Sequence, residues 1–181
     1  MNAKLRNKAR FVIHHVGADL LQHPKVVETQ THVHHSISKH EHLVRTARIS
    51  YRLARMLKAD VGICVRAAII HDIDSRLGTL STHGRIAAVW AAQQGECEAV
   101  CHAIETHMYP IGPKPRTREA WVLSLADKAA SLTDLTVALG GVLSKRERER
   151  RRERALGDML WQAHVTERRD RRRRMDENSL V

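Results

Sequence analysis

AAIIHDID, residues 67–74, is the stretch from which the fold of this chain can be worked out. Its apolar run ends in a histidine and an aspartate side by side, His71 and Asp72. Burying two such side chains costs free energy unless something pairs with them. A divalent metal ion that accepts nitrogen and oxygen ligands is a suitable partner. Since the pair alone could equally end an ordinary helix, a metal site requires further ligands elsewhere in the chain.

The composition favours a helical protein. The chain has 181 residues, 43% of them hydrophobic, which is enough for one domain with a core. Only 3% are aromatic, and no run of β-branched residues alternates with polar ones, so the core must be built from Leu, Ile, Val, Ala and Met. We therefore predict an all-α helical bundle.

The cysteines and the N-terminal segment exclude several classes of protein. Three cysteines without a C-x-x-C pair indicate neither a disulfide framework nor a zinc ribbon. His14, His15 and Asp19 interrupt the apolar positions near the N-terminus, which is typical of neither a signal peptide nor a membrane span. We expect a cytoplasmic protein that does not contact membranes.

Apolar periodicity and helix-end signals divide most of the chain into six helices. Ser38 is the expected N-cap of the second helix, with Glu41 completing a capping box, and Asp60 is the expected N-cap of the third. The predicted helical segments are residues 3–22, 42–60, 61–72, 82–94, 96–108 and 117–140.

Each helix after the first carries a histidine or aspartate on or beside its apolar face. Six nitrogen and oxygen donors are too many for one tetrahedral ion, and they suit two metals that share a bridging carboxylate. Such a pair of ions binds phosphate and activates water. The predicted ligands are His42, His71, Asp72, His83, His107 and Asp127.

The order of these ligands resembles that of the HD superfamily of metal-dependent phosphohydrolases, an all-helical fold named for its His-Asp doublet. The resemblance spans roughly residues 31–134 and includes the context of each ligand. Its motifs in this chain are EHLVRTARISYRLARML, AAIIHD, STHGRIAAVWA, IETHMYP and VLSLADKAASL.

The resemblance implies that these six residues bind two divalent transition metals, with Asp72 as the bridge. Iron or manganese is expected, with Zn, Mg, Co and Ni as alternatives. Several family members have a lysine three positions after the doublet, where this chain has Ser75 and then Arg76. The cation facing the substrate phosphate is therefore Arg76 or comes from elsewhere, with Lys128 as a further candidate. His34 lies at a family-like position for substrate contact, although a solvated loop histidine fits equally well.

The C-terminal segment differs from the rest in composition. Residues 145–181 hold 13 Lys and Arg against eight acids, within a total formal charge of +11. We predict a phosphohydrolase domain at 1–141 and a basic helical tail at 142–181. A solvated helix is the simpler interpretation of the tail, and binding of nucleic acid is the alternative.

The predicted function is hydrolysis of a phosphoester or phosphoanhydride in a nucleotide or another small phosphorylated metabolite. Two alternatives stay open. The same ligands can hold mixed-valent iron in HD-type oxygenases, and a nucleotide-sensing module with a nucleic-acid-binding tail would keep the same core. A homo-oligomer is compatible with the sequence.

Overall fold

The computed structural model describes residues 3–34 and 37–141. The predicted tail, residues 142–181, lies outside the described residues. The helices are α1 (Ala3–Val16), α2 (Ala18–Gln22), α3 (Pro24–Glu28), α4 (Lys39–Leu57), α5 (Val61–Ile70), η1 (Ser75–Leu77), α6 (His83–Gln93), α7 (Glu98–Thr106) and α8 (Arg118–Gly141). One small hairpin, β1 (Val33–His34) and β2 (Ile37–Ser38), precedes α4.

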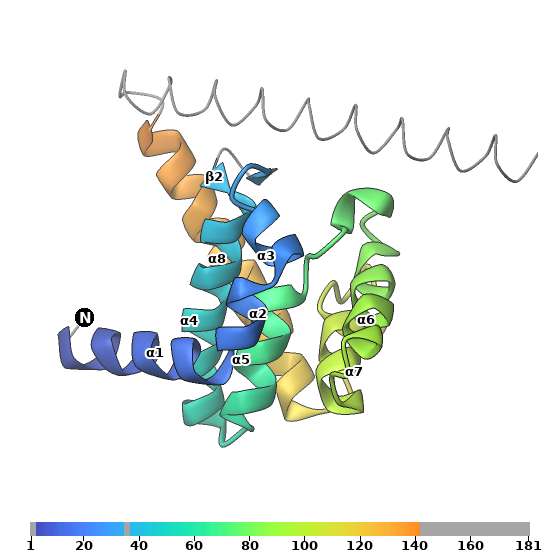
Figure 1. Cartoon of the computed structure of the whole chain (residues 1–181), viewed down its shortest axis with the longest axis horizontal. Helices are drawn as coiled ribbons and strands as arrows, with labels where there is room; N and C mark the ends of the chain where they lie inside the picture. Colours follow the sequence, from blue (N-terminus) through green and yellow to red (C-terminus); the bar gives the residue numbers. More distant parts are fainter. Residues whose placement is uncertain (1–2, 35–36, 142–181) are drawn as a thin grey trace, which may run out of the picture.

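The predicted all-α bundle is confirmed. Helix α4 packs against both α5 and α8, while α6 and α7 form a pair that joins the bundle through contacts of α7 with α5 and α8 (Figure 1). The core that these helices share is aliphatic, and Ile69, Ile70, Ile104 and Leu123 are fully buried within it. Within the described ranges, no helix is both long and apolar enough to cross a bilayer.

Side-chain caps start the two helices that bring in the central ligands. Ser38 Oγ accepts a hydrogen bond from the Glu41 backbone N–H at 3.2 Å, and Asp60 Oδ1 accepts one from the Ile63 N–H at 2.9 Å. Both N-caps are as the sequence predicts, because this interaction depends only on residues three positions apart. The caps fix where α4 and α5 begin and therefore which way their ligands face.

The prediction of one continuous helix over 3–22 is wrong. The chain turns at Gly17, where α1 ends and α2 begins. A β-carbon at Gly17 would lie 2.2 Å from Cδ1 of Ile69, so glycine allows this close approach to α5 with the Ile69 side chain in its present position. The turn results from packing against a helix about fifty residues further on, which helical periodicity does not encode.

Candidate metal centre

The six predicted ligands come together on five segments of the bundle. His42 lies in the first turn of α4, His71 caps the C-terminal end of α5 and Asp72 follows it. His83 begins α6, and His107 caps the C-terminal end of α7. Asp127 lies within α8. All six are buried, so the folded chain itself removes their side chains from bulk water.

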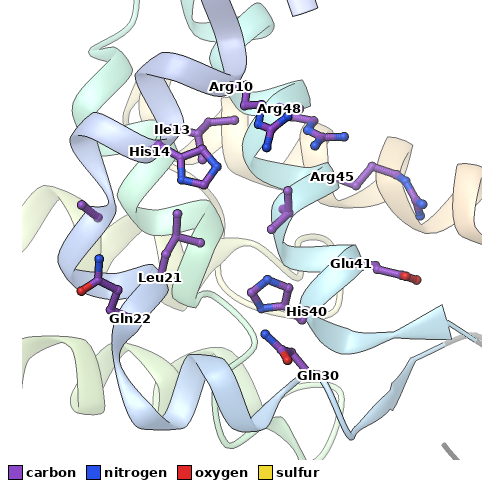
Figure 2. Close-up of a pocket in the computed structure, with 12 residues that line it drawn as sticks. Arg10, Ile13, His14, Leu21, Gln22, Gln30, His40, Glu41, Arg45 and Arg48 are labelled. Carbon is purple, nitrogen blue, oxygen red and sulfur yellow. The ribbon is translucent and has the colours of Figure 1, made fainter. Parts of the chain in front are cut away.

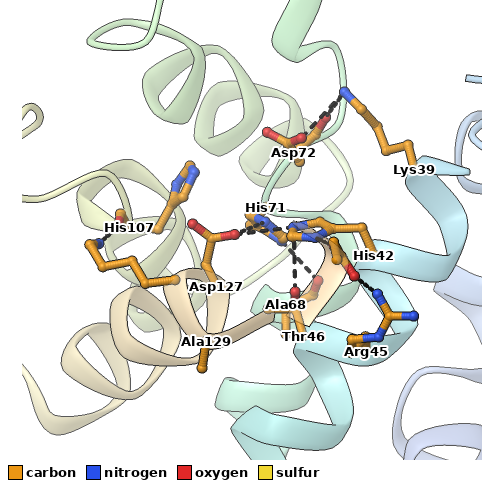
Figure 3. A network of polar contacts seen from close by, with 12 residues as sticks. Lys39, His42, Arg45, Thr46, Ala68, His71, Asp72, His107, Asp127 and Ala129 are labelled. Carbon is orange, nitrogen blue, oxygen red and sulfur yellow. Dashed lines mark hydrogen bonds and ion pairs between the residues drawn. The ribbon is translucent and has the colours of Figure 1, made fainter. Parts of the chain in front are cut away.

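The donor atoms of these side chains lie close to one another. Figure 3 shows the side chains of His42, His71, Asp72, His107 and Asp127. Oδ1 of Asp127 is 3.1 Å from Nε2 of His42 and 3.4 Å from Nε2 of His71. On the other side, Nε2 of His83 is 3.4 Å from Oδ1 of Asp72 and 3.1 Å from Nε2 of His107. We call these six residues the ligand cluster.

Every histidine of the ligand cluster is oriented by a hydrogen bond at its outer nitrogen. Carbonyl and carboxylate oxygens only accept hydrogen bonds, so each Nδ1 carries the proton, and the lone pair of each Nε2 is left to face the cluster. The acceptors are Asp134 Oδ2 for His42 (2.6 Å), Ala68 O for His71 (3.0 Å), Thr79 O for His83 (2.9 Å) and Ile104 O for His107 (2.6 Å).

This arrangement places two nitrogen lone pairs opposite each other at His83 and His107. Lone pairs at 3.1 Å repel unless a cation lies beside both. Two nitrogen ligands of one ion, each about 2.1 Å from it, are separated by about 3 Å when they are at right angles. The spacing therefore fits a shared metal ion.

The electrostatics of the cluster favour the protonation states that bind metal. Burial lowers the pKa of His107 to about 4, and repulsion from His71 adds to this, so the ring is neutral at pH 7. Burial alone would raise the pKa of Asp127, but the neighbouring imidazoles of His42 and His71 outweigh it and hold that pKa well below its usual value. Neutral imidazoles and an ionised carboxylate are the forms that coordinate cations.

A glycine allows the two halves of the cluster to meet. Gly84 follows His83, and a β-carbon there would lie 2.9 Å from the backbone oxygen of Glu105 and 3.0 Å from that of Ile104. The start of α6 therefore packs directly on the end of α7, which places His83 beside His107. Gly84 is visible in the sequence, but its role can be recognised only when the position of α7 is known.

Among the residues that the structure describes, two groups of side chains could each hold an ion. His42, His71 and Asp127 form one, and His71, Asp72 and His107 form the other, with the donor atoms of each group within 4.8 Å of one another. His83 adds a donor beside the second group. The donor set of imidazole nitrogens and carboxylate oxygens fits a borderline divalent ion such as iron, manganese or zinc.

Lys39 is a contributor that the sequence analysis did not identify. Its side chain is almost fully buried, and Nζ lies 3.3 Å from Oδ2 of Asp72 and donates to the carbonyl of that residue at 3.2 Å. It also donates to Ser75 Oγ. Oδ1 of Asp72 is left to face His83, so Lys39 orients the carboxylate. A lysine at a helix start is usually solvated, and only the fold reveals this role.

Asp134 is the second contributor that was missed. It is fully buried on α8, accepts the hydrogen bond from His42 and also forms an ion pair with Arg45. Seven residues separate it from Asp127, so the two carboxylates lie on one face of α8, on either side of the His42 ring. The spacing of seven residues, two turns of a helix, is the feature of the sequence that could have indicated a role for Asp134 beside Asp127. Arg45 of α4 turns inward to pair with Asp134.

A cleft of about 610 Å³ opens beside the ligand cluster, and Asp72, His83, His107 and Asp127 form part of its wall. Lys128 also lines it, and its ammonium donates to the carbonyl oxygens of His107 and Ser124 and to Ser124 Oγ. Burial lowers the pKa of Lys128, and the neighbouring Asp127 opposes that effect. The predicted cation Lys128 therefore lies where a small substrate could reach both it and the cluster.

The other predicted substrate contacts are placed differently. Arg76 lines a separate small cavity with His32 and Lys39, because the left-handed backbone at Asp74 (φ 56°) redirects the chain before η1. Asp74 pairs with Lys25 on α3 and not with a ligand imidazole. The backbone of His34 belongs to β1, but its side chain lies outside the described residues.

Comparison with known protein families agrees with this geometry. The sequence model of the HD-domain family matches residues 40–132, which include all six residues of the cluster. The chain belongs to the HD-domain family. This family is part of the metal-dependent phosphohydrolase superfamily, so the resemblance noted in the sequence is confirmed.

Several curated relatives of this HD domain carry the same name. Ribonuclease Y of Thermobifida fusca is 40% identical over 88 residues, 48% of this chain and 17% of the relative. The enzymes of that name from Cutibacterium acnes and Salinispora arenicola are 41% and 40% identical, over 40% and 50% of this chain. The matches span only 14% and 15% of those two relatives. No solved structure matches significantly.

Proposed function

We propose that this chain hydrolyses a phosphoester or phosphoanhydride in a nucleotide or another small phosphorylated metabolite, using two divalent transition-metal ions. The supporting observation is the ligand cluster, in which four oriented histidines and two carboxylates converge at the wall of a substrate-sized cleft. Iron or manganese suits this mixture of nitrogen and oxygen donors.

Each group of residues has a distinct task in this proposal. Bound ions would supply Lewis acidity, which lowers the pKa of a coordinated water to near neutral and offsets charge on phosphoryl oxygens. His42, His71 and Asp127 hold one side of the cluster, while Asp72, His83 and His107 hold the other. Lys128 contributes a fixed positive charge at the cleft, where charge develops on the oxygens of the reacting phosphate.

The test is a phosphate-release assay in an anaerobic chamber with added Mn²⁺ or Fe²⁺, across nucleotides and dinucleoside polyphosphates. We expect release by the full-length chain and loss of it in Asp72→Asn. Asp74→Asn is the matched control, since Asp74 pairs with Lys25 away from the ligand cluster. Equal activity in both variants would contradict the proposal.

The anaerobic condition also separates the two alternatives from the leading proposal. A mixed-valent iron oxygenase would be inactive without O₂ and active with it. A nucleotide-sensing module would bind nucleotide and metal under both conditions without releasing phosphate.

An RNA phosphodiester is a second candidate substrate, favoured by the name Ribonuclease Y shared by the relatives over this domain. The formal charge of +11 suits a polyanion. End-labelled single-stranded RNA, added in parallel with the nucleotides, tests it. If the RNA is shortened by the unaltered chain but not by the Asp72→Asn variant, RNA is the substrate. If the RNA stays intact while phosphate is released from nucleotides, the small molecule is the substrate.

A further inference from the structure

A second cavity, of about 800 Å³, opens where α1, α2 and α4 meet (Figure 2). We call it the basic groove. Side chains of α1, α2 and α4 line it, including Arg10, Ile13, Leu21, Val44 and Arg48. His42 and Val44 are two residues apart, so they project about 200° apart around α4. None of the six residues of the ligand cluster lines the groove.

The charge of the groove is positive. Three guanidinium groups, those of Arg10, Arg45 and Arg48, line it with a single carboxylate, that of Glu41. Burial lowers the pKa of Arg45, Glu41 opposes this, and repulsion from Arg48 adds to the lowering. Like charges brought together in this way favour an anion between them.

Two of the three arginines have no protein partner among the described side chains. Arg45 is already paired with Asp134. Arg10 and Arg48 are exposed, and none of the side chains in residues 7–32 and 38–136 forms a hydrogen bond or ion pair with either. Both side chains line the groove, so an anion bound there could reach both guanidinium groups.

The rest of the lining is suited to more than a bare anion. Ile13, Leu21 and Val44 form an apolar part of the wall, and Gln22 and Gln30 add amides that can both donate and accept hydrogen bonds. An apolar surface with a few amides fits the face and the polar edge of a nucleobase, while paired guanidinium groups fit phosphate oxygens.

From this combination we propose that the basic groove is a binding site for a nucleoside monophosphate, separate from the metal centre. The phosphate lies between Arg10 and Arg48, and the nucleoside lies over the partly exposed Leu21 and Val44. A volume of about 800 Å³ accommodates a ligand of this size.

Isothermal titration of the full-length chain with AMP tests the site. Arg48→Glu should weaken binding by about tenfold or more, because it replaces a phosphate contact with a repelling charge. Arg52→Glu is the matched control: it makes the same charge change one turn further along α4, exposed and outside the groove, and should change affinity less than about twofold. Arg10→Gln provides a second, milder variant in case Arg48→Glu does not fold.

Further titrations separate the groove from the metal centre and the phosphate from the nucleoside. AMP should bind Asp72→Ala as it binds the unaltered chain, and both adenosine and inorganic phosphate should bind about tenfold more weakly than AMP. Equal losses from Arg48→Glu and Arg52→Glu, absence of AMP binding, or binding lost in Asp72→Ala would each overturn the proposal. Equal affinity for AMP and inorganic phosphate would overturn the nucleoside part.

Discussion

The ligand cluster and the basic groove lie on two sides of α4 and are built in different ways. In the cluster every histidine is buried and held at Nδ1 by an acceptor. Figure 3 shows this for His71 and Ala68. In the groove, Arg10 and Arg48 are exposed, and their guanidinium groups lie at the ends of long, flexible side chains. Folding has therefore already organised the cluster, whereas a ligand in the groove must order the arginines when it binds.

This difference predicts where substitutions matter most. In the cluster, one altered side chain disturbs neighbours that are already fixed, so its effect on ion binding is large. In the groove, water and salt screen each contact, so its effect on ligand binding is modest.

The largest effect is expected from Asp72→Ala. Asp72 lies between His83 and Lys39, and the removal of its carboxylate should release both ions or nearly so. His83→Ala and His107→Ala should each release mainly one. Metal content after anaerobic reconstitution with Mn²⁺ or Fe²⁺ measures this, with Asp74→Ala as control. Equal losses from all three cluster variants would contradict a bridging role for Asp72.

Asp134→Asn should have the next largest effect. The asparagine amide can donate a hydrogen bond to Nδ1 as well as accept one from it. His42 is therefore no longer held in the tautomer whose Nε2 lone pair faces the cluster. Loss of such a partner typically lowers metal affinity by about 10–100-fold. Competition with a metal chelator measures the affinity, and nitrogen NMR shifts of His42 report its tautomer. Asp19→Asn, at an exposed ion pair with Arg66, makes the same chemical change away from the cluster. Unchanged affinity and tautomer in Asp134→Asn would show that the hydrogen bond does not orient His42.

Gly84→Ala should act on the distance between α6 and α7. The added β-carbon meets two backbone oxygens of α7, which cannot move as a side chain can, so overpacking should cost about 1–3 kcal/mol of unfolding free energy. Binding of the ion shared by His83 and His107 should weaken in parallel. Gly62→Ala on α5 is the control, since the nearest atom there belongs to the side chain of Asp60. Urea unfolding and metal titration check both effects, and equal stabilities of the two variants would refute the close approach.

The last expected effect concerns the pH dependence of stability, measured on metal-free protein in chelator. The pKa of His107 is about 4 in the folded chain, against 6.5 when unperturbed, so between these values the unfolded chain holds a proton that the folded chain does not. The stability that neutral His107 contributes is therefore complete above pH 6.5 and is lost as pH falls toward 4, by at most about 1.4 kcal/mol per pH unit for one proton. His107→Gln should flatten this slope in urea unfolding, whereas His14→Gln on exposed α1 should keep it. Identical slopes in the unaltered chain and His107→Gln would exclude this contribution.

The sequence by itself determined the features that depend on neighbours a few positions apart. The N-caps at Ser38 and Asp60 and the position of His71 at the end of α5 follow from spacings of three and four residues, which a helix turns into contacts. The order of the six ligands and the motifs around them indicated the resemblance to the HD family, and the composition predicted the all-α bundle.

Only the tertiary structure decided which distant side chains support that order. His42 and Asp134 are 92 residues apart, Lys39 and Asp72 are 33 apart, and the break at Gly17 depends on Ile69. The inward turn of Arg45, the cavity that Arg76 faces and the groove between α1 and α4 likewise depend on how whole helices approach one another. Helical periodicity indicates which face of a helix is buried, but the partner of that face is set by the packing of the complete chain.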